Sequence, residues 1–98
     1  MTAINVVRFR VRPGMEQAFL DAHRNGNAAW PGLSSGHIVE VGARTFVLIG
    51  QWPDAAVLAS ARKRMIETLD TFRHTLEDLG SGLGVTDAAS GPVVLSLK

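Results

Sequence analysis

The chain has 98 residues, of which 46% are hydrophobic, and this length and composition predict one globular domain. A formal net charge of +1 argues against a dedicated nucleic-acid-binding protein, which would carry a basic surplus. No apolar run approaches the roughly 18 residues that a membrane-spanning helix needs, and the lack of cysteine excludes disulfides and thiolate metal sites and fits a reducing compartment such as the cytoplasm.

The first predicted element is a strand from Ala3 to Val11, in which side chains alternate between two faces. This segment lacks a cationic start followed by an apolar core, so we expect no signal peptide. Pro13-Gly14 ends the strand. A helix is expected from Pro13 to Asn27, because apolar residues recur there at spacings of three and four. His23 lies on the flank of that apolar stripe.

Two further strands are expected from Leu33 to Val41 and from Arg44 to Trp52. Gly42-Ala43 between them suits a type II′ turn, which favours glycine at its first central position. The register set by this turn pairs His37 with Leu48 and places both on one apolar face. The opposite face is also substantially apolar, and helices can cover only one of the two. The hairpin therefore predicts a homodimer.

After these strands we expect a short helix from Ala55 to Arg64, capped by Asp54, and a second helical stretch from Met65 to Leu79. A glycine-rich loop from Gly80 to Gly91 and a last strand from Pro92 to Lys98 complete the chain. The order β-α-β-β-α-β is that of the ferredoxin-like split βαβ plan. The sequence therefore predicts an α+β fold with a four-stranded antiparallel sheet.

His37 is the most promising candidate for chemistry, since no motif in the sequence is specific enough to name a reaction. Gly50, diagonal to it in the predicted register, leaves room beside its ring. An imidazole buried under the helices would have a lowered pKa and would be able to accept a proton from a phenolic ligand. The alternative is a core histidine satisfied by a backbone carbonyl or water.

Three other residues are weaker candidates. Asn5 would orient a ligand carbonyl, or it is simply a polar residue at the rim of a strand. Trp30 and Trp52 are packing residues or walls of a pocket. The 3 histidines fall on three different predicted elements and lack the spacing of a helical metal pair, so no metal site is expected.

The segments VVRFRVRPGMEQAFLDAHR, WPGLSSGHIVEV and TFVLIGQW resemble the antibiotic biosynthesis monooxygenase superfamily of small dimeric α+β barrels. In that family a "-pG-" turn ends the first strand, a "pGl" segment opens the second and a tryptophan closes the third. Pro13-Gly14, Pro31-Gly32-Leu33 and Trp52 stand at those places, and the match covers Asn5 to Leu79. The resemblance implies a single such domain over residues 1–98 and a homodimer, with a ligand pocket between each sheet and its own helices.

Enzymes of that family include oxygenases that act on polyketide phenols and quinols without metal or flavin, and haem-degrading branches. The resemblance implies a cofactor-independent monooxygenase of a small aromatic, quinol or polyketide-like compound. In such an enzyme we expect His37 to be the catalytic residue, as base or as orienting group, and Asn5, His23, Trp30 and Trp52 to contact the substrate. Haem degradation is disfavoured, because the region from Ala55 to Ala61 has no histidine and no tryptophan. The alternative is a non-catalytic small-molecule-binding or stress-related dimeric domain.

Overall fold

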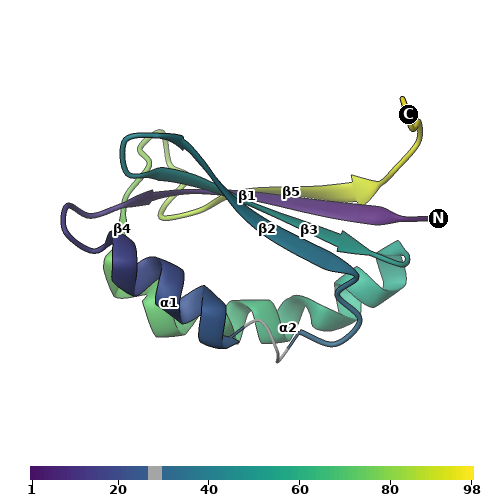
Figure 1. Cartoon of the computed structure of the whole chain (residues 1–98), viewed down its shortest axis with the longest axis horizontal. Helices are drawn as coiled ribbons and strands as arrows, with labels where there is room; N and C mark the ends of the chain where they lie inside the picture. Colours follow the sequence, from purple (N-terminus) through teal and green to yellow (C-terminus); the bar gives the residue numbers. More distant parts are fainter. Residues whose placement is uncertain (27–29) are drawn as a thin grey trace.

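The computed structural model describes residues 1–26 and 30–98, in which two helices lie on one side of an antiparallel sheet (Figure 1). The elements follow one another as β1 (Ala3–Val11), α1 (Glu16–Gly26), β2 (Ser35–Gly42), β3 (Thr45–Trp52), α2 (Ala55–Phe72), the 3₁₀ turn η2 (Arg73–Thr75), β4 (Leu76–Glu77) and β5 (Asp87–Pro92). The predicted ferredoxin-like α+β fold is confirmed, with five strands among the described residues where four were expected. None of the described helices is long and apolar enough to cross a membrane.

Strand β1 lies in the middle of the sheet, between β3 on one side and both β4 and β5 on the other. β4 pairs with the end of β1 at Arg10 and Val11, and β5 pairs with its earlier residues, from Ala3 to Arg8. The prediction of a last strand over Pro92 to Lys98 is wrong, although apolar residues alternate there. Only Val93 continues the pairing, by donating to the carbonyl of Thr2 at 2.7 Å, because β1 offers almost no backbone beyond that point.

Helix α2 is one continuous helix, where a short helix and a second stretch were expected. Asp54 caps it as predicted, with its Oδ1 accepting a 2.8 Å hydrogen bond from the backbone N–H of Val57. The helix ends at Phe72, and the prediction that it continues to Leu79 is wrong. Leu76, which continues the apolar spacing of the helix, is buried as a residue of strand β4 and not of a helix.

Helix α1 begins at Glu16 and not at Pro13. Pro13 and Gly14 form a turn, in which Gly14 has a φ of 81° that glycine adopts without steric cost. The predicted end at Asn27 lies outside the described residues.

The turn between β2 and β3 is formed by Ala43 and Arg44, one residue later than predicted. Gly42 lacks the positive φ that a type II′ turn requires, and Arg44 has a φ of 55° instead. The register also shifts between Glu40 and Gly42, which leaves Val41 without a counterpart on β3. This is a β-bulge, an extra residue on one strand of the pair.

The bulge reverses the two faces of β2 relative to the prediction. His37 pairs with Ile49, and Ile38 pairs with Leu48. Because a shift of one residue moves every side chain of a strand to the other face, Ile38 packs against the core under the helices and His37 is exposed on the opposite side.

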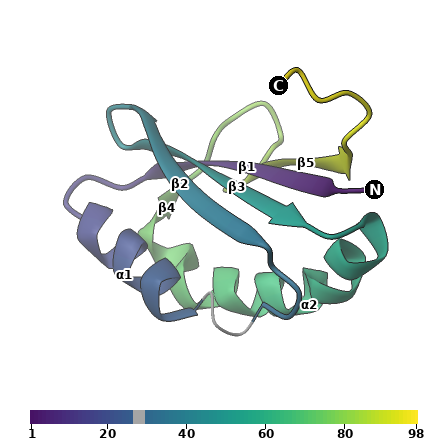
Figure 2. The ribbon, with the colours of Figure 1, turned by 45° about the vertical axis from the view of Figure 1, so that its right-hand side comes forward.

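The hydrophobic core fills the space between the sheet and the two helices. Its larger members are Phe9, Val11, Phe19, Trp30, Phe46, Leu48, Trp52, Leu58, Phe72 and Leu76. The other side of the sheet carries neither of the described helices (Figure 1), and it exposes Val6, Val39 and Ile49. The C-terminal residues after β5 rise on that same open side (Figure 2).

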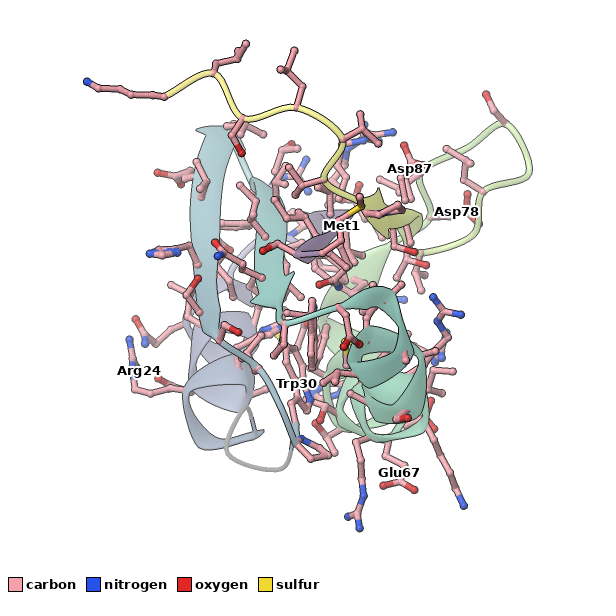
Figure 3. All side chains as sticks on the ribbon, turned by 90° about the vertical axis from the view of Figure 1, so that its right-hand side faces the viewer. Met1, Arg24, Trp30, Glu67, Asp78 and Asp87 are labelled. Atoms are coloured by element: carbon pink, nitrogen blue, oxygen red, sulfur yellow. The ribbon has the colours of Figure 1, made fainter. Side chains whose placement is uncertain are left out.

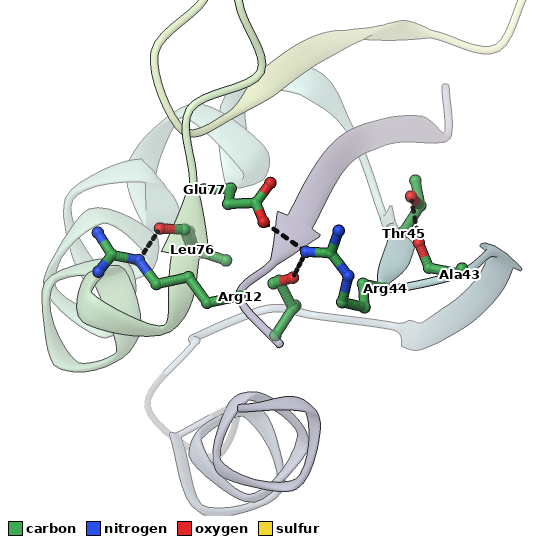
Figure 4. A network of polar contacts seen from close by, with 7 residues as sticks. Arg12, Ala43, Arg44, Thr45, Leu76 and Glu77 are labelled. Carbon is green, nitrogen blue, oxygen red and sulfur yellow. Dashed lines mark hydrogen bonds and ion pairs between the residues drawn. The ribbon is translucent and has the colours of Figure 1, made fainter. Parts of the chain in front are cut away.

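Arg44 links the hairpin turn to the end of β1 and to β4, which lies on the other side of β1 (Figure 4). Its guanidinium donates to the carbonyl of Val11 at 2.9 Å and forms an ion pair with Glu77 of β4. Nearby, Nε of Arg12 donates to the carbonyl of Leu76 at 2.8 Å. These contacts hold the two-residue strand β4 against β1.

Candidate functional site

A cavity of about 380 Å³ lies between the sheet and the helices. Its walls are largely apolar and include Val7, Phe9, Leu48, Leu58, Leu69 and Phe72. A small number of polar side chains also line it, with Asn5 and His23 buried. An apolar cavity with a few placed polar groups is typical of a site for a small organic molecule.

Asn5 lies on the helix side of β1, and its amide orientation is fixed by Trp52. Oδ1 of Asn5 accepts a 2.8 Å hydrogen bond from Nε1 of Trp52, at the end of β3. The amide nitrogen Nδ2 therefore carries the free donors, and its contact is Sδ of Met65 at 3.8 Å. Because a thioether is a weak acceptor, Asn5 retains a strong N–H donor for a carbonyl in the cavity.

Gly50 provides the space for this pair. It lies opposite Asn5 in the β1–β3 ladder, and a Cβ on it would lie 2.3 Å from Oδ1 of Asn5 and 3.1 Å from Nε1 of Trp52. The sequence predicted room beside Gly50, and that room is occupied by Asn5 and Trp52 and not by His37.

His23 lines the cavity from α1 and is surrounded by aromatic rings. The ring centroids of Phe9, Phe19 and Phe72 lie 5.8, 4.6 and 4.3 Å from that of the imidazole. Burial lowers the pKa of His23 from its ordinary value of 6.5, and a hydrogen bond to the Phe19 carbonyl opposes part of that shift. The imidazole is therefore neutral at pH 7.

The backbone of α1 selects the tautomer of this neutral ring. Nδ1 of His23 lies 3.0 Å from the carbonyl oxygen of Phe19. A carbonyl can only accept, so Nδ1 carries the proton and Nε2 keeps its lone pair. Nε2 is buried and finds no hydrogen-bond partner in the described part of the chain. Leaving a buried acceptor unpaired costs about 1–3 kcal/mol, so a ligand hydroxyl that reaches Nε2 would recover that free energy.

Trp30 lines the cavity, and Figure 3 shows it in the interior between the two helices. Its Nε1 donates a 2.9 Å hydrogen bond to Oγ1 of Thr68 on α2, and this hydroxyl donates to the carbonyl of Arg64 at 3.0 Å. Trp52 is fully buried and lies outside the cavity lining, so it acts on the site through Asn5.

His37, the predicted catalytic base, lies away from the cavity. It is exposed on the open face of the sheet, and the prediction that the helices bury it is wrong, because the bulge at Val41 reverses the faces of β2. His23 is the histidine that is buried beside the cavity. In residues 1–26 and 30–98, no group of three or more His, Asp or Glu side chains is placed to hold a metal ion.

Arg62 and Met65 line the cavity and were absent from the predicted site. The signal that finds Arg62 is its position four residues after the buried Leu58, on the same side of one helix.

The fold is that of several solved structures. A proposed antibiotic biosynthesis monooxygenase from Chloroflexus aurantiacus superposes with a TM-score of 0.74 at 11% identity, over 98% of this chain and 96% of that chain. Another from Nitrosomonas europaea gives 0.75 at 16% identity, over 95% and 90% of the two chains. A mutant of the cofactor-independent oxygenase SnoaB from Streptomyces nogalater gives 0.69 at 16% identity, over 98% and 96%.

No protein-family model and no curated protein matches the sequence. The predicted resemblance to the antibiotic biosynthesis monooxygenase superfamily is confirmed at the level of the fold.

Proposed function

We propose that this chain, which has the fold of the antibiotic biosynthesis monooxygenases, is a cofactor-independent monooxygenase of a small aromatic, quinol or polyketide-like compound. The observation that carries the proposal is a neutral imidazole in an apolar cavity, with the Nε2 lone pair of His23 unpaired among the described residues. The fold is shared with SnoaB, a cofactor-independent oxygenase, which supports chemistry without an added cofactor.

In the proposed reaction the substrate itself reduces dioxygen. Nε2 of His23 accepts a proton from a phenolic hydroxyl or an activated methylene. The Nδ2 group of Asn5 donates to the substrate carbonyl, on which negative charge develops. When a methylene becomes a carbonyl, one atom of dioxygen enters the product. The other leaves as water with the two hydrogens, so no external reductant is needed.

The surroundings of these two groups suit such a reaction. Phe9, Phe19 and Phe72 surround the buried ring of His23. Trp52 donates to Oδ1 of Asn5 and thereby fixes the orientation of its amide. An apolar enclosure strengthens the hydrogen bonds made inside it and protects reactive intermediates from side reactions.

Oxygen uptake with anthrone and with substituted hydroquinones as probe substrates tests this proposal. The variant His23→Gln should lower the rate by roughly 10²- to 10⁴-fold, the usual contribution of a general base. The control His74→Gln alters an exposed histidine and should keep the wild-type rate. Binding of these probes without any oxygen uptake would favour the alternative, a non-catalytic small-molecule-binding domain.

We also propose that the chain forms a homodimer through the open faces of two sheets. On that face Val6, Val39 and Ile49 are 39%, 41% and 37% exposed, and the two helices cover only the opposite face. Two such faces packed together would remove this apolar surface from water. Each protomer would keep its own cavity, because the cavity lies on the helix side. The absence of cysteine supports the cytoplasm as the compartment.

A further inference from the structure

Arg62 lies at the mouth of the cavity, on the side where α2 faces β5. It lines the cavity although it is exposed, and so does Ile66, one helical turn later, which is 50% exposed. Ser90 and Thr86 line the same cavity from β5 and from the residues just before it. A side chain that is both exposed and part of the lining marks where the cavity opens to solvent, and its aliphatic stem can remain against apolar residues while its charge stays in water.

The charge of Arg62 is not neutralised within the described part of the chain. Its Nη2 donates a 3.4 Å hydrogen bond to Oγ of Ser90, which holds the guanidinium toward β5. The four ion pairs found among the described residues are Arg8–Asp87, Arg24–Asp21, Arg44–Glu77 and Arg73–Asp70. No aspartate or glutamate lines the cavity in that part, so Arg62 is its one charged lining residue.

The polar groups that line the cavity are therefore neutral in its interior and charged at its mouth. The buried groups are a neutral amide and a neutral imidazole, Asn5 and His23, between walls that are mainly apolar. A charged group of a ligand would lose its hydration in the interior. At the mouth it would stay partly solvated and meet a guanidinium, whose planar fork matches the two oxygens of a carboxylate.

We propose that the ligand of this cavity is an aromatic carboxylate, with its ring system inside and its carboxylate bound at the mouth by Arg62. Ser90 and Thr86 offer hydroxyl donors beside the same group. The inference rests on the proposed function, because both concern the same cavity. It narrows the substrate class to acids. It gives Arg62 a part in ligand selection and none in the chemical step.

Calorimetric titration with 2-naphthoate and with its neutral analogue 2-naphthamide tests the proposal without any need for turnover. The wild-type protein should bind the acid roughly tenfold more tightly than the amide, as a charge-assisted hydrogen bond permits. Arg62→Gln should bring the two affinities together and leave the amide affinity unchanged. The matched control Lys63→Gln removes the same charge from the neighbouring exposed residue and should keep the tenfold preference.

Equal binding of acid and amide by the wild-type protein would overturn this proposal and leave the cavity, and the proposed monooxygenase, standing. Loss of the preference in both variants would also overturn it, since net charge alone would then explain the effect. Failure of both probes to bind would count against the cavity as a ligand site, and with it against both proposals. A preserved preference with no oxygen uptake from anthrone or from an anthrone carboxylate would remove only the monooxygenase.

Discussion

Nε1 of Trp52 donates a 2.8 Å hydrogen bond to Oδ1 of Asn5, and both side chains are buried, at 0% and 6% exposure. The bond joins the end of β3 to the beginning of β1, two strands that pair directly. It also fixes the orientation of the asparagine amide, so that Nδ2 with its donors is directed toward Met65 in the cavity lining. A contact that stabilises the core thus determines which end of the Asn5 amide is offered to a ligand.

Gly50→Ala should disturb this pair and destabilise the protein by about 1–3 kcal/mol, the usual cost of overpacking a core. The new Cβ would lie 2.3 Å from Oδ1 of Asn5, and either the amide or the indole would have to move. Urea unfolding measures the change in the free energy of unfolding. Gly91→Ala is the matched control, because no atom lies within 4 Å of its Cβ position, and its effect should stay within about 0.5 kcal/mol. Equal stabilities of the two variants would contradict the close approach at Gly50.

Acidification should destabilise the protein through His23. Its pKa is lowered by burial in the folded chain and is about 6.5 in the unfolded chain. Between those two values the unfolded chain binds a proton that the folded chain does not bind, so acid favours unfolding. The contribution is therefore fully present above about pH 6.5 and is lost as the pH falls through the folded pKa.

Thermal or urea unfolding at several pH values from about 7.5 to 5 measures this dependence. His23→Gln should flatten the curve, whereas His74→Gln at an exposed position should leave its slope unchanged. An NMR titration that places the pKa of His23 at or above 6.5 would disprove the burial argument.

At the hairpin turn, Arg44→Ala should destabilise the protein more than Arg44→Gly does. Both variants lose the hydrogen bond to Val11 and the ion pair with Glu77. The φ of 55° at this position costs an alanine about 1 kcal/mol and costs a glycine little. Urea unfolding of the two variants isolates the backbone contribution from that of the side chain. If alanine is tolerated as well as glycine, the turn does not hold this residue in the left-handed region.

A charge on the open face of the sheet should prevent dimerisation. Val39→Glu would place a carboxylate between two apolar sheets, where an unpaired charge is strongly unfavourable. Ala59→Glu adds the same charge to an exposed position of α2 and should leave the dimer intact. Sedimentation equilibrium at tens of micromolar distinguishes the two outcomes, and a monomeric wild-type protein under these conditions would refute the proposed dimer.

Local sequence signals determined β1 and the start of α2 correctly. The strand has the predicted bounds because its side chains alternate and Pro13-Gly14 follows it, and the helix begins after its predicted cap, Asp54. The hairpin was misjudged because the expected turn depended on Gly42, whereas Arg44 adopts the positive φ. A positive φ at an arginine cannot be predicted from the residue type, because arginine rarely adopts that conformation.

The last strand was misplaced for a different reason. Residues of β5 are small or polar and show no apolar alternation, and they form a strand because the edge of β1 lies beside them. Such pairing depends on tertiary structure. The same holds for the site. Asn5, His23 and Trp30 line the cavity, and their contact with a substrate stays a prediction. The placement of His37 required the register of β2.

The unpaired Val41 has a consequence for comparing this chain with others of its fold. If β2 were paired residue by residue from its turn, Val39 would lie opposite Leu48 and His37 opposite Gly50, and both would face the helices. A protein of equal length without the bulge therefore presents the reverse side of this strand, even where its residues align with these without a gap. A protein shorter by that one residue presents the same side. Residues of this strand that align in sequence with those of another protein therefore do not always occupy the same position in space. A histidine aligned with His37 can lie on the other side of the sheet.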